Sequence, residues 1–328
     1  MIPTFVFISM TILCVSTIMG LFTNAIIITV NVVDKIKGKS ISASDLILVT
    51  MGVSNVIFQL IMLANDFCSL LDSNLYFSKE VYIIFSVVLN ASIFSSFWFT
   101  VCLSINYYFQ IVIFTHPFLI RLKLAVFRFI PQLLMASVFV SLGTCIPVIW
   151  NIIVYDNDFN MTINQTAEIS LPELNLVYMV ISTLISCSLP LVLVGIANGL
   201  IIKSLVTHTH KSDRNEKGDL SARAEGRIRA ARTLSCLLFI YISFYVSEIL
   251  MFTDVFPPSS PGLCACLIVI YSYPPAQSIV LIFGSPKLKQ AAVNIMRRMG
   301  GFKEEKSKTA TVSFIKFNIK KVVPPPAT

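Results

Sequence analysis

The sequence predicts an all-α membrane protein, a bundle of seven transmembrane helices. Of its 328 residues, 55% are hydrophobic and only 13% are charged, whereas an ordinary soluble domain has about 25% charged residues. Five stretches carry no Lys, Arg, Asp or Glu: residues 1–33, 81–120, 129–155, 174–202 and 255–286. Each is long enough to cross a bilayer core, which takes about 20 apolar residues in a helix. These observations exclude a soluble enzyme, a disordered chain and a disulfide-rich secreted scaffold.

Two shorter runs complete the set of spans. Residues 46–65 are uncharged between Asp45 and Asp66, and residues 233–253 contain only Glu248 as a charged residue. Because all the runs are continuously apolar, they favour helices over the alternating strands of a transmembrane β-barrel. The expected spans are 5–33, 44–66, 81–111, 129–153, 174–203, 232–253 and 263–283.

Basic residues mark one side of this arrangement. All but one of the 25 Lys and Arg lie after spans one, three and five or in the tail, and the other side keeps only Lys79. Short basic connections stay in the cytoplasm, so we expect the N-terminus outside and the C-terminus inside the cell. The chain then divides into a seven-span domain, residues 1–286, and a basic cytoplasmic tail, residues 287–328. This orientation and contact with anionic lipid of the bilayer explain the net charge of +8, which indicates no nucleic-acid partner.

The loop between spans four and five, residues 154–173, is expected outside the cell. It contains the sequons of Asn160 and Asn164 and no Cys, and glycosylation of such sites requires exposure on that side. Three cysteines are expected near the same surface: Cys68, Cys264 and Cys266. They either pair in an oxidising compartment or remain free.

No pattern of an enzyme or a metal site is present in the sequence. It contains no HExxH, GxSxG or P-loop motif, and Glu248 is the only acid clearly inside a span. Transporters commonly show duplicated halves and ionisable pairs at mid-membrane, and neither is present. The sequence therefore favours a receptor that binds a ligand in its outer half, without metal or cofactor, and relays a conformational change to a cytoplasmic partner. A small-solute transporter is the alternative.

Five blocks of residues point to a family. They are Gly20, Asn24 and Val30-Asn31; WFTVCLS at 98–104 with Tyr107; Phe114-Thr115-His116-Pro117 with Leu122-Lys123; Ser204-Leu205 with His208; and QSIVLIFGSPKLKQ at 277–290. In this order they resemble blocks of the vertebrate bitter taste receptors, the type 2 taste receptors, and the resemblance covers all seven spans. The rhodopsin-like Asp-Arg-Tyr and Asn-Pro-x-x-Tyr motifs are missing here, as they are in that family.

This resemblance implies the architecture of a G-protein-coupled receptor in the plasma membrane. Its ligands would be small, bitter organic molecules, and its partner a heterotrimeric G protein of the gustducin type. Within the receptor class the alternative is a vomeronasal-type chemoreceptor, which should lack the Leu288-Lys289-Gln290 ending. Asn55 and Gln110 replace an Arg and a Lys that the family usually has, and Arg227 stands where a His is common. The chain therefore resembles a divergent member.

The main ligand-binding candidates lie near the outer end of span six. Tyr241, Phe244, Tyr245 and Glu248 follow i, i+3, i+4, i+7 spacing and share one helix face. An aromatic face with one acid suits an amphipathic or cationic small molecule. The alternative is that Glu248 reaches the outer water and that the tyrosine hydroxyls bond neighbouring helices.

Span three is expected to offer a more apolar wall than the family usually has. The resemblance places the family's pocket residues, a Trp and an Asn, at Leu89 and Ile93, and Asn90 lies off that register. Selectivity should therefore differ from that of receptors that keep those polar anchors. Asn65 and Asp66, at the outer end of span two, complete the candidate ligand set.

Two further groups of residues concern coupling. Asn24, Asn55 and Ser278 are expected to join spans one, two and seven by neutral hydrogen bonds, either as helix packing or as part of a switch. The resemblance implies G-protein contacts at the inner ends of spans three, five and six and at the start of the tail. They are Tyr107, Gln110, His116, Lys123, His208, Arg227, Arg232, Lys287 and Lys289. Lys123 and Lys287 lie in the blocks that match best.

Overall fold

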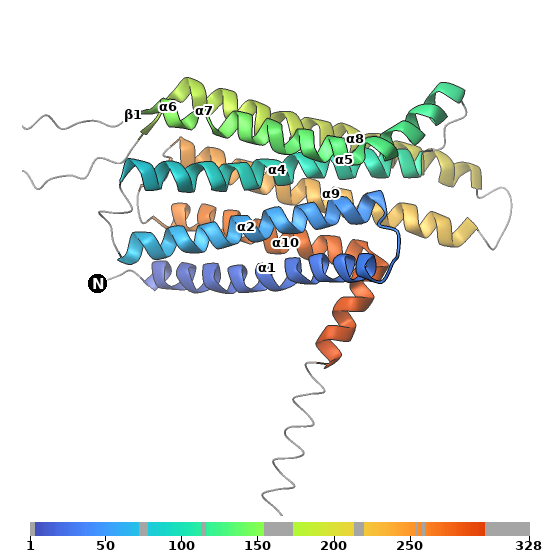
Figure 1. Ribbon diagram of the computed structural model, residues 1–328, viewed down its shortest axis with the longest axis horizontal. Helices are drawn as coiled ribbons and strands as arrows, with labels where there is room; N and C mark the ends of the chain where they lie inside the picture. The colour runs from blue at the N-terminus through green and yellow to red at the C-terminus, as the bar shows by residue number, and fades with distance from the viewer. Residues whose placement is uncertain are drawn as a thin grey trace, which may run out of the picture.

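The computed structural model is a bundle of long helices that run nearly parallel to one another (Figure 1). It describes residues 4–71, 78–112, 116–153, 173–212, 220–253, 255–257 and 260–298. Within these residues, seven helices are long and apolar enough to cross a membrane. The seven-helix bundle that the sequence predicts is thereby confirmed.

The elements follow one another along the chain. They are α1 (Thr4–Ile36), α2 (Ala43–Leu71), α4 (Lys79–Ile111), α5 (Pro117–Cys145), α6 (Val148–Asn151), β1 (Ile152–Ile153), β2 (Glu173–Leu174), α7 (Leu176–Thr183), η1 (Leu184–Ser188), α8 (Leu189–Ser212), α9 (Leu220–Phe252) and α10 (Pro261–Gly284). The π-helical turn η1 joins α7 to α8, so the three belong to one span. The short strands β1 and β2 pair antiparallel. A helix over residues 286–298, the C-terminal helix, follows α10 and turns away from the bundle (Figure 1).

Several helices begin before the span that the sequence predicts. α5 begins at Pro117 and α9 at Leu220, ahead of the predicted span starts at 129 and 232. At Pro117 the fixed φ suits the first helical turn and the missing N–H is not needed there, and His116 Nδ1 accepts a hydrogen bond from Phe118 N at 3.3 Å. A charge-free run marks only the part of a helix that the bilayer core surrounds, so charged turns extend these helices beyond it.

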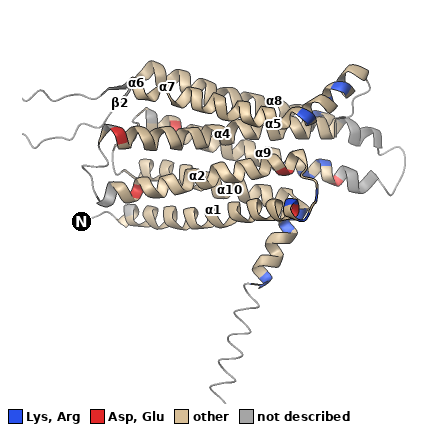
Figure 2. Ribbon diagram, viewed as in Figure 1, with Lys and Arg blue, Asp and Glu red and all other residues tan. Residues whose placement is uncertain are grey.

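Lys and Arg gather at one end of the described bundle (Figure 2). This basic end holds the turn between α1 and α2, the start of α5, the start of α9 and the C-terminal helix. At the opposite end, which we call the distal end, α4 begins and the β1–β2 pair lies (Figure 1). The separation agrees with the charge pattern of the sequence, whereas the assignment of the basic end to the cytoplasm stays a prediction.

Apolar side chains cover the outside of the bundle, and polar ones lie between the helices. Ile18 and Phe239 are 69% and 71% exposed, while Asn24, Ser104 and Asn106 are fully buried. Lipid tails are as apolar as leucine, so membrane helices gain little by hiding apolar groups and are joined instead by close packing and hydrogen bonds. The distribution of side chains is therefore the one that a lipid environment favours.

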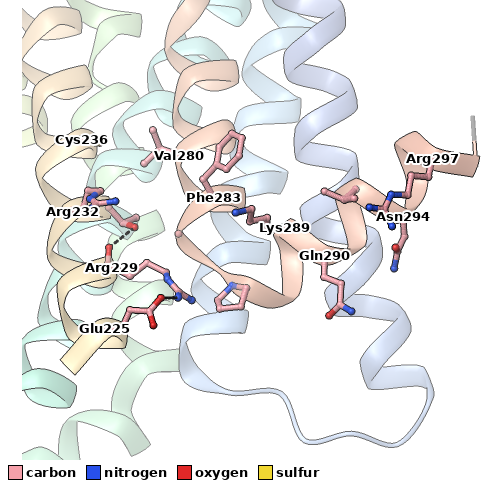
Figure 3. Close-up of a pocket in the computed structure, with 14 residues that line it drawn as sticks. Glu225, Arg229, Arg232, Cys236, Val280, Phe283, Lys289, Gln290, Asn294 and Arg297 are labelled. Atoms are coloured by element: carbon pink, nitrogen blue, oxygen red, sulfur yellow. Dashed lines mark hydrogen bonds and ion pairs between the residues drawn. The ribbon is translucent and has the colours of Figure 1, made fainter. Parts of the chain in front are cut away.

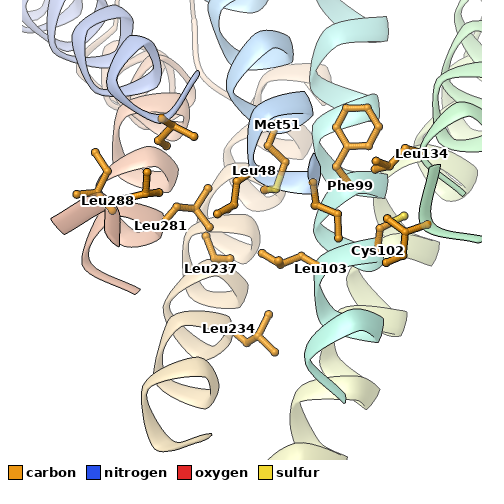
Figure 4. Close-up of a cluster of buried hydrophobic side chains, with 14 of the residues drawn as sticks. Leu48, Met51, Phe99, Cys102, Leu103, Leu134, Leu234, Leu237, Leu281 and Leu288 are labelled. Atoms are coloured by element: carbon orange, nitrogen blue, oxygen red, sulfur yellow. The ribbon is translucent and has the colours of Figure 1, made fainter. Parts of the chain in front are cut away.

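One core cluster lies toward the basic end (Figure 4). It joins Leu48 of α2, Leu103 of α4, Leu234 of α9 and Leu281 of α10. Leu288 of the C-terminal helix is fully buried in the same cluster. The C-terminal helix is therefore packed onto the bundle at its start, although it then turns away.

Candidate functional site

Four aromatic rings pack together near the middle of the bundle. Phe97 of α4 stacks on Tyr241 of α9, with ring centroids 3.9 Å apart and 14° between the ring planes. Phe244 of α9 and Tyr273 of α10 meet Phe97 edge-on at 5.2 Å and 5.3 Å, and meet each other at 5.1 Å. All four side chains are buried. This aromatic cluster joins three helices, and ring contacts of this kind contribute about 0.5–1.5 kcal/mol each beyond the buried area.

The hydroxyl groups of the two tyrosines of α9 contact the neighbouring span. The Tyr241 hydroxyl donates to the carbonyl oxygen of Cys187 at 2.7 Å. The Tyr245 hydroxyl lies 2.7 Å from Ser188 Oγ. Both contacts are with the π-helical turn η1. The tyrosine hydroxyls therefore bond a neighbouring helix, which is one of the two alternatives that the sequence leaves open.

Glu248 is buried farther along α9, with only 7% of its surface exposed. Its Oε2 accepts a hydrogen bond from the thiol of Cys187 at 3.5 Å. No Lys, Arg or His in the described part of the chain forms an ion pair with this carboxylate. The alternative in which Glu248 reaches the outer water is therefore not the arrangement found. A charged acid inside a membrane is energetically unfavourable without a counter-ion, so a cation at this place would be stabilising.

The candidate residues of α4 contribute an apolar surface beside the aromatic cluster. Ile93 is 2% exposed and belongs to the same core cluster as Tyr241 and Phe244. Leu89 is half-buried and packs against that cluster. Asn90 is also half-buried, and its side chain has no hydrogen bond to the aromatic residues. The structure thus brings Leu89 and Ile93 together with the face of α9 that the sequence singled out.

Asp66 lies at the distal end of α2 and contacts α10 there. The Tyr271 hydroxyl is 2.7 Å from Asp66 Oδ1 and 2.6 Å from Oδ2. Asn65 precedes it and is half-buried. Because a tyrosine hydroxyl carries one proton, the two short distances describe one shared hydrogen bond. Asp66 therefore links α2 to α10 through Tyr271. The sequence did not predict this contact.

Two other predictions concern the distal end. The cysteines considered for pairing, Cys68, Cys264 and Cys266, are free thiols in the structure, so no disulfide joins them. The sequon residues Asn160 and Asn164 lie outside the described residues, and their glycosylation stays a prediction.

Next to the aromatic cluster, neutral side chains from four helices form a buried polar network. Asn55 Nδ2 of α2 donates to Asn24 Oδ1 of α1 at 3.1 Å and to Gln277 Oε1 of α10 at 2.7 Å. Ser96 Oγ of α4 lies 3.2 Å from both Asn55 Oδ1 and Gln277 Oε1. Gln277 Nε2 donates to the Tyr273 hydroxyl at 2.9 Å. The network, Asn24, Asn55, Ser96 and Gln277, is therefore bonded directly to the aromatic cluster.

Ser278 lies outside this network, although the sequence grouped it with Asn24 and Asn55. Its Oγ donates to the Pro275 carbonyl at 2.9 Å and lies 2.6 Å from Thr23 Oγ1 of α1. The link between α10 and α2 comes instead from Gln277, one residue earlier. Adjacent residues of a helix point about 100° apart, so a helix rotation that the sequence does not specify decides which of them meets Asn55.

At the basic end, Lys287 is held by side chains of α1 and α2. Its Nζ lies 2.9 Å from Asp34 Oδ2 and 3.5 Å from Asp45 Oδ1. It also donates to Asn31 Oδ1 at 2.7 Å. Lys39 forms a second ion pair with Asp34 at 2.9 Å. This group is called the basic-end clamp here, and it engages the ammonium that the resemblance had assigned to a G-protein contact.

The remaining coupling candidates differ in their exposure. Gln110 is exposed, and its Nε2 lies 3.3 Å from Ser44 Oγ of α2. Tyr107 is half-buried and packs against the core cluster of the basic end. The half-exposed candidates are Lys123 and Arg227; the exposed ones are His116, Arg232 and Lys289. The side chain of His208 lies outside what the structure describes.

These features define a class of protein. In the described part of the chain, seven apolar helices surround an aromatic cluster next to a buried acid, and a neutral polar network beside that cluster joins four of the helices. Such a multi-pass bundle has the architecture of a G-protein-coupled receptor.

Comparison with known proteins identifies the family. The family model described as "Taste receptor protein (TAS2R)" matches residues 1–299. Taste receptor type 2 member 40 of Gallus gallus is 27% identical over 283 residues, which cover 85% of this chain and 91% of that protein. Taste receptor type 2 member 39 of Homo sapiens is 27% identical over 305 residues, which cover 92% and 90%. The chain therefore belongs to the type 2 taste receptor family and is a chemosensory membrane receptor rather than an enzyme.

Proposed function

We propose that this receptor binds small, bitter organic molecules beside the aromatic cluster, and that it prefers amphipathic cations. The observation that supports this preference is the burial of Glu248 without a cationic partner among the described residues. A ligand ammonium would supply the missing charge. Tyr245, which is half-buried, offers an aromatic face that attracts a cation by about 0.5–2 kcal/mol. Leu89 and Ile93 would contact the apolar part of the ligand.

Ligand binding would act on the aromatic cluster, whose rings are packed against one another in this structure. Phe97 and Tyr241 are stacked and fully buried, so a ligand that inserts beside Glu248 favours an arrangement in which these rings separate. A ligand shifts a receptor toward the state that it binds better. Tyr273 contacts both Phe97 and Gln277, so the change would pass from the rings to the polar network.

We expect the basic end to face the cytoplasm and to bind a heterotrimeric G protein of the gustducin type. The support is the collection of Lys and Arg at that end, because basic connections are retained on the cytoplasmic side. Gln110 and His116 are exposed there and are candidate contacts, together with Lys123. Lys287, which is engaged by Asp34, would contribute by fixing the position of the C-terminal helix.

The decisive experiment compares Glu248→Gln with Glu80→Gln, an exposed acid in the first turn of α4. Cells that supply a promiscuous G protein are screened for calcium flux with cationic and neutral bitter compounds. Glu248→Gln should weaken cationic agonists by about tenfold or more, the equivalent of about 1.4 kcal/mol, and leave neutral agonists unchanged. Glu80→Gln should change neither group. Equal potency of the cationic panel on Glu248→Gln and the parent receptor, at matched surface expression, would remove Glu248 from the ligand site.

A further inference from the structure

A groove runs along the outside of the basic end, between α9, the end of α10 and the C-terminal helix (Figure 3). Its volume is about 870 Å³, within the range of about 300–1,000 Å³ that is usual for small-molecule sites. Arg232 and Cys236 face it from α9, Phe283 from α10 and Lys289 from the C-terminal helix. The groove is separate from the aromatic cluster, the polar network and the basic-end clamp.

Positive charge reaches the groove from both of its sides. Arg229 and Arg232 line it from α9, and Lys289 and Arg297 line it from the C-terminal helix. Among the described residues that line it, the one acid is Glu225, which pairs with Arg229 at 2.8 Å. Arg232, Lys289 and Arg297 have no ion pair within the described part of the chain. In the described part of the molecule, three cations therefore face one groove without compensating acids, an arrangement that favours a multiply charged anion.

Apolar side chains continue the groove toward the middle of the bundle. Phe283 is 63% exposed, and Cys236 is exposed as well. Val280 lies one turn of α10 deeper than Phe283. Val280 and Phe283 lie before the end of α10, whereas Lys289 lies beyond it. Along α9, Cys236 follows Arg232 by about one turn toward the middle of the helix. The groove therefore changes from polar to apolar along its length, as the surface of a bilayer does.

A close contact between α9 and α10 closes the groove toward the interior of the bundle. A Cβ atom on Gly284 would overlap Thr233 Oγ1, so the two helices touch where glycine leaves room for the threonine. Both residues line the groove, and Thr233 is 5% exposed. The groove thus opens toward the surrounding lipid and not toward the centre of the helix bundle.

We propose that this groove binds an anionic phospholipid from the leaflet at the basic end. A headgroup with several negative charges, such as a phosphorylated inositol, would lie among Arg232, Lys289 and Arg297, and an acyl chain would follow Phe283 and Cys236. Anionic lipids are concentrated in the cytoplasmic leaflet, so the inference uses the proposed orientation. It uses neither the proposed ligand nor the proposed G protein. Because the headgroup bridges α9 and the C-terminal helix, occupancy would oppose their separation.

The test measures lipid binding directly. Purified full-length receptor is titrated with fluorescent phosphatidylinositol bisphosphate, and binding is followed by anisotropy. The double variant Arg232→Gln and Lys289→Gln removes one cation from each side of the groove. Its matched control, Arg121→Gln and Arg128→Gln, removes two exposed cations of α5 at the same end. The groove variant should bind at least about tenfold more weakly, because each basic residue adds appreciably to attraction for anionic lipid, and the control should bind like the parent. Equal weakening of both variants would overturn the inference.

Two further arms separate the lipid from other anions and from the G protein. Phe283→Ala should weaken binding of the lipid and leave the binding of soluble inositol trisphosphate unchanged, since only the lipid has a chain to place on that ring. If the soluble headgroup binds as tightly as the lipid, a free phosphate rather than a phospholipid is the ligand, and the proposal fails. It also fails if the groove variant loses G-protein activation but binds the lipid normally. None of the binding measurements needs an agonist, so they stand whatever the outcome of the Glu248 experiment.

Discussion

The ammonium of Lys287 lies 2.9 Å from Asp34 Oδ2, although the two residues stand near opposite ends of the chain. The same nitrogen donates to Asn31 and lies 3.5 Å from Asp45. One side chain thus ties the C-terminal helix to α1 and α2. The resemblance to relatives directs attention to Lys287 as a contact for a partner, but its geometry indicates a positioning role.

The two members of this ion pair should behave as a unit. Lys287→Gln and Asp34→Asn are each expected to lower the free energy of unfolding only slightly, because the side chains are 35% and 20% exposed and solvent screens such pairs. The double variant should lose little more than either single variant. Thermal unfolding of the purified receptor measures the loss of stability in each variant. The control is Arg298→Gln, which changes an exposed residue of the C-terminal helix. A double loss equal to the sum of the single losses would show that the pair is not coupled.

The polar network should stabilise the bundle through Asn55. Asn55→Ala removes the donor to Asn24 Oδ1 and Gln277 Oε1, and hydrogen bonds between membrane helices contribute about 0.6–2 kcal/mol. Thr50→Ala is the control on α2, because among the described residues the Thr50 hydroxyl bonds only to carbonyls of its own helix. Thermal unfolding should therefore show a larger loss for Asn55→Ala. An equal loss for the two variants would contradict a stabilising link between α1, α2 and α10.

Gly284 should resist substitution even by alanine. The added Cβ would overlap Thr233 Oγ1 and lie 2.9 Å from Thr233 Cγ2, and overpacking in a close contact typically costs about 1–3 kcal/mol. Gly284→Ala should therefore reduce the yield of folded receptor at the cell surface. Thr233→Ala removes both of these atoms and should restore part of that yield in the double variant. The control is Gly195→Ala on α8, where a Cβ would meet nothing within 4 Å. If Thr233→Ala brings no recovery, the contact is not the cause of the loss.

The sequence predicts the shared face of α9 correctly but not its surroundings. Tyr241 and Phe244 lie together in one cluster, as i, i+3 spacing requires. Phe97 and Tyr273, which complete the aromatic cluster, come from helices whose rotation the sequence leaves open. In a soluble helix the apolar stripe would reveal that rotation. Here the lipid-facing side is apolar and much of the core-facing side is apolar as well, so hydrophobic periodicity carries little of that information.

The polar network shows the same limit at a finer scale. The hydrogen bond between Asn24 and Asn55 is anticipated because both are amides within apolar runs. The sequence pattern does not assign Ser96 or Gln277 to this network, although Gln277 is equally conspicuous as an amide inside a span. The rotation of α10 about its axis decides the contact, because it turns Gln277 rather than Ser278 toward α2. Likewise, the pairing of Lys287 with Asp34 depends on the turn after Gly284, which the charge pattern alone does not specify.

The π-helical turn η1 has a consequence for how its span is assembled. A π-helical turn accommodates one residue more than an α-helical turn, so the two halves of the span are offset by about 100° from an uninterrupted helix. On one half, the Tyr178 hydroxyl reaches the Thr144 carbonyl at 2.8 Å; at the turn itself, Cys187 meets Glu248. Deleting one residue between Tyr178 and Cys187 would convert the π-helical turn into a regular α-helical turn. Only one of the two side chains could then still face its present partner.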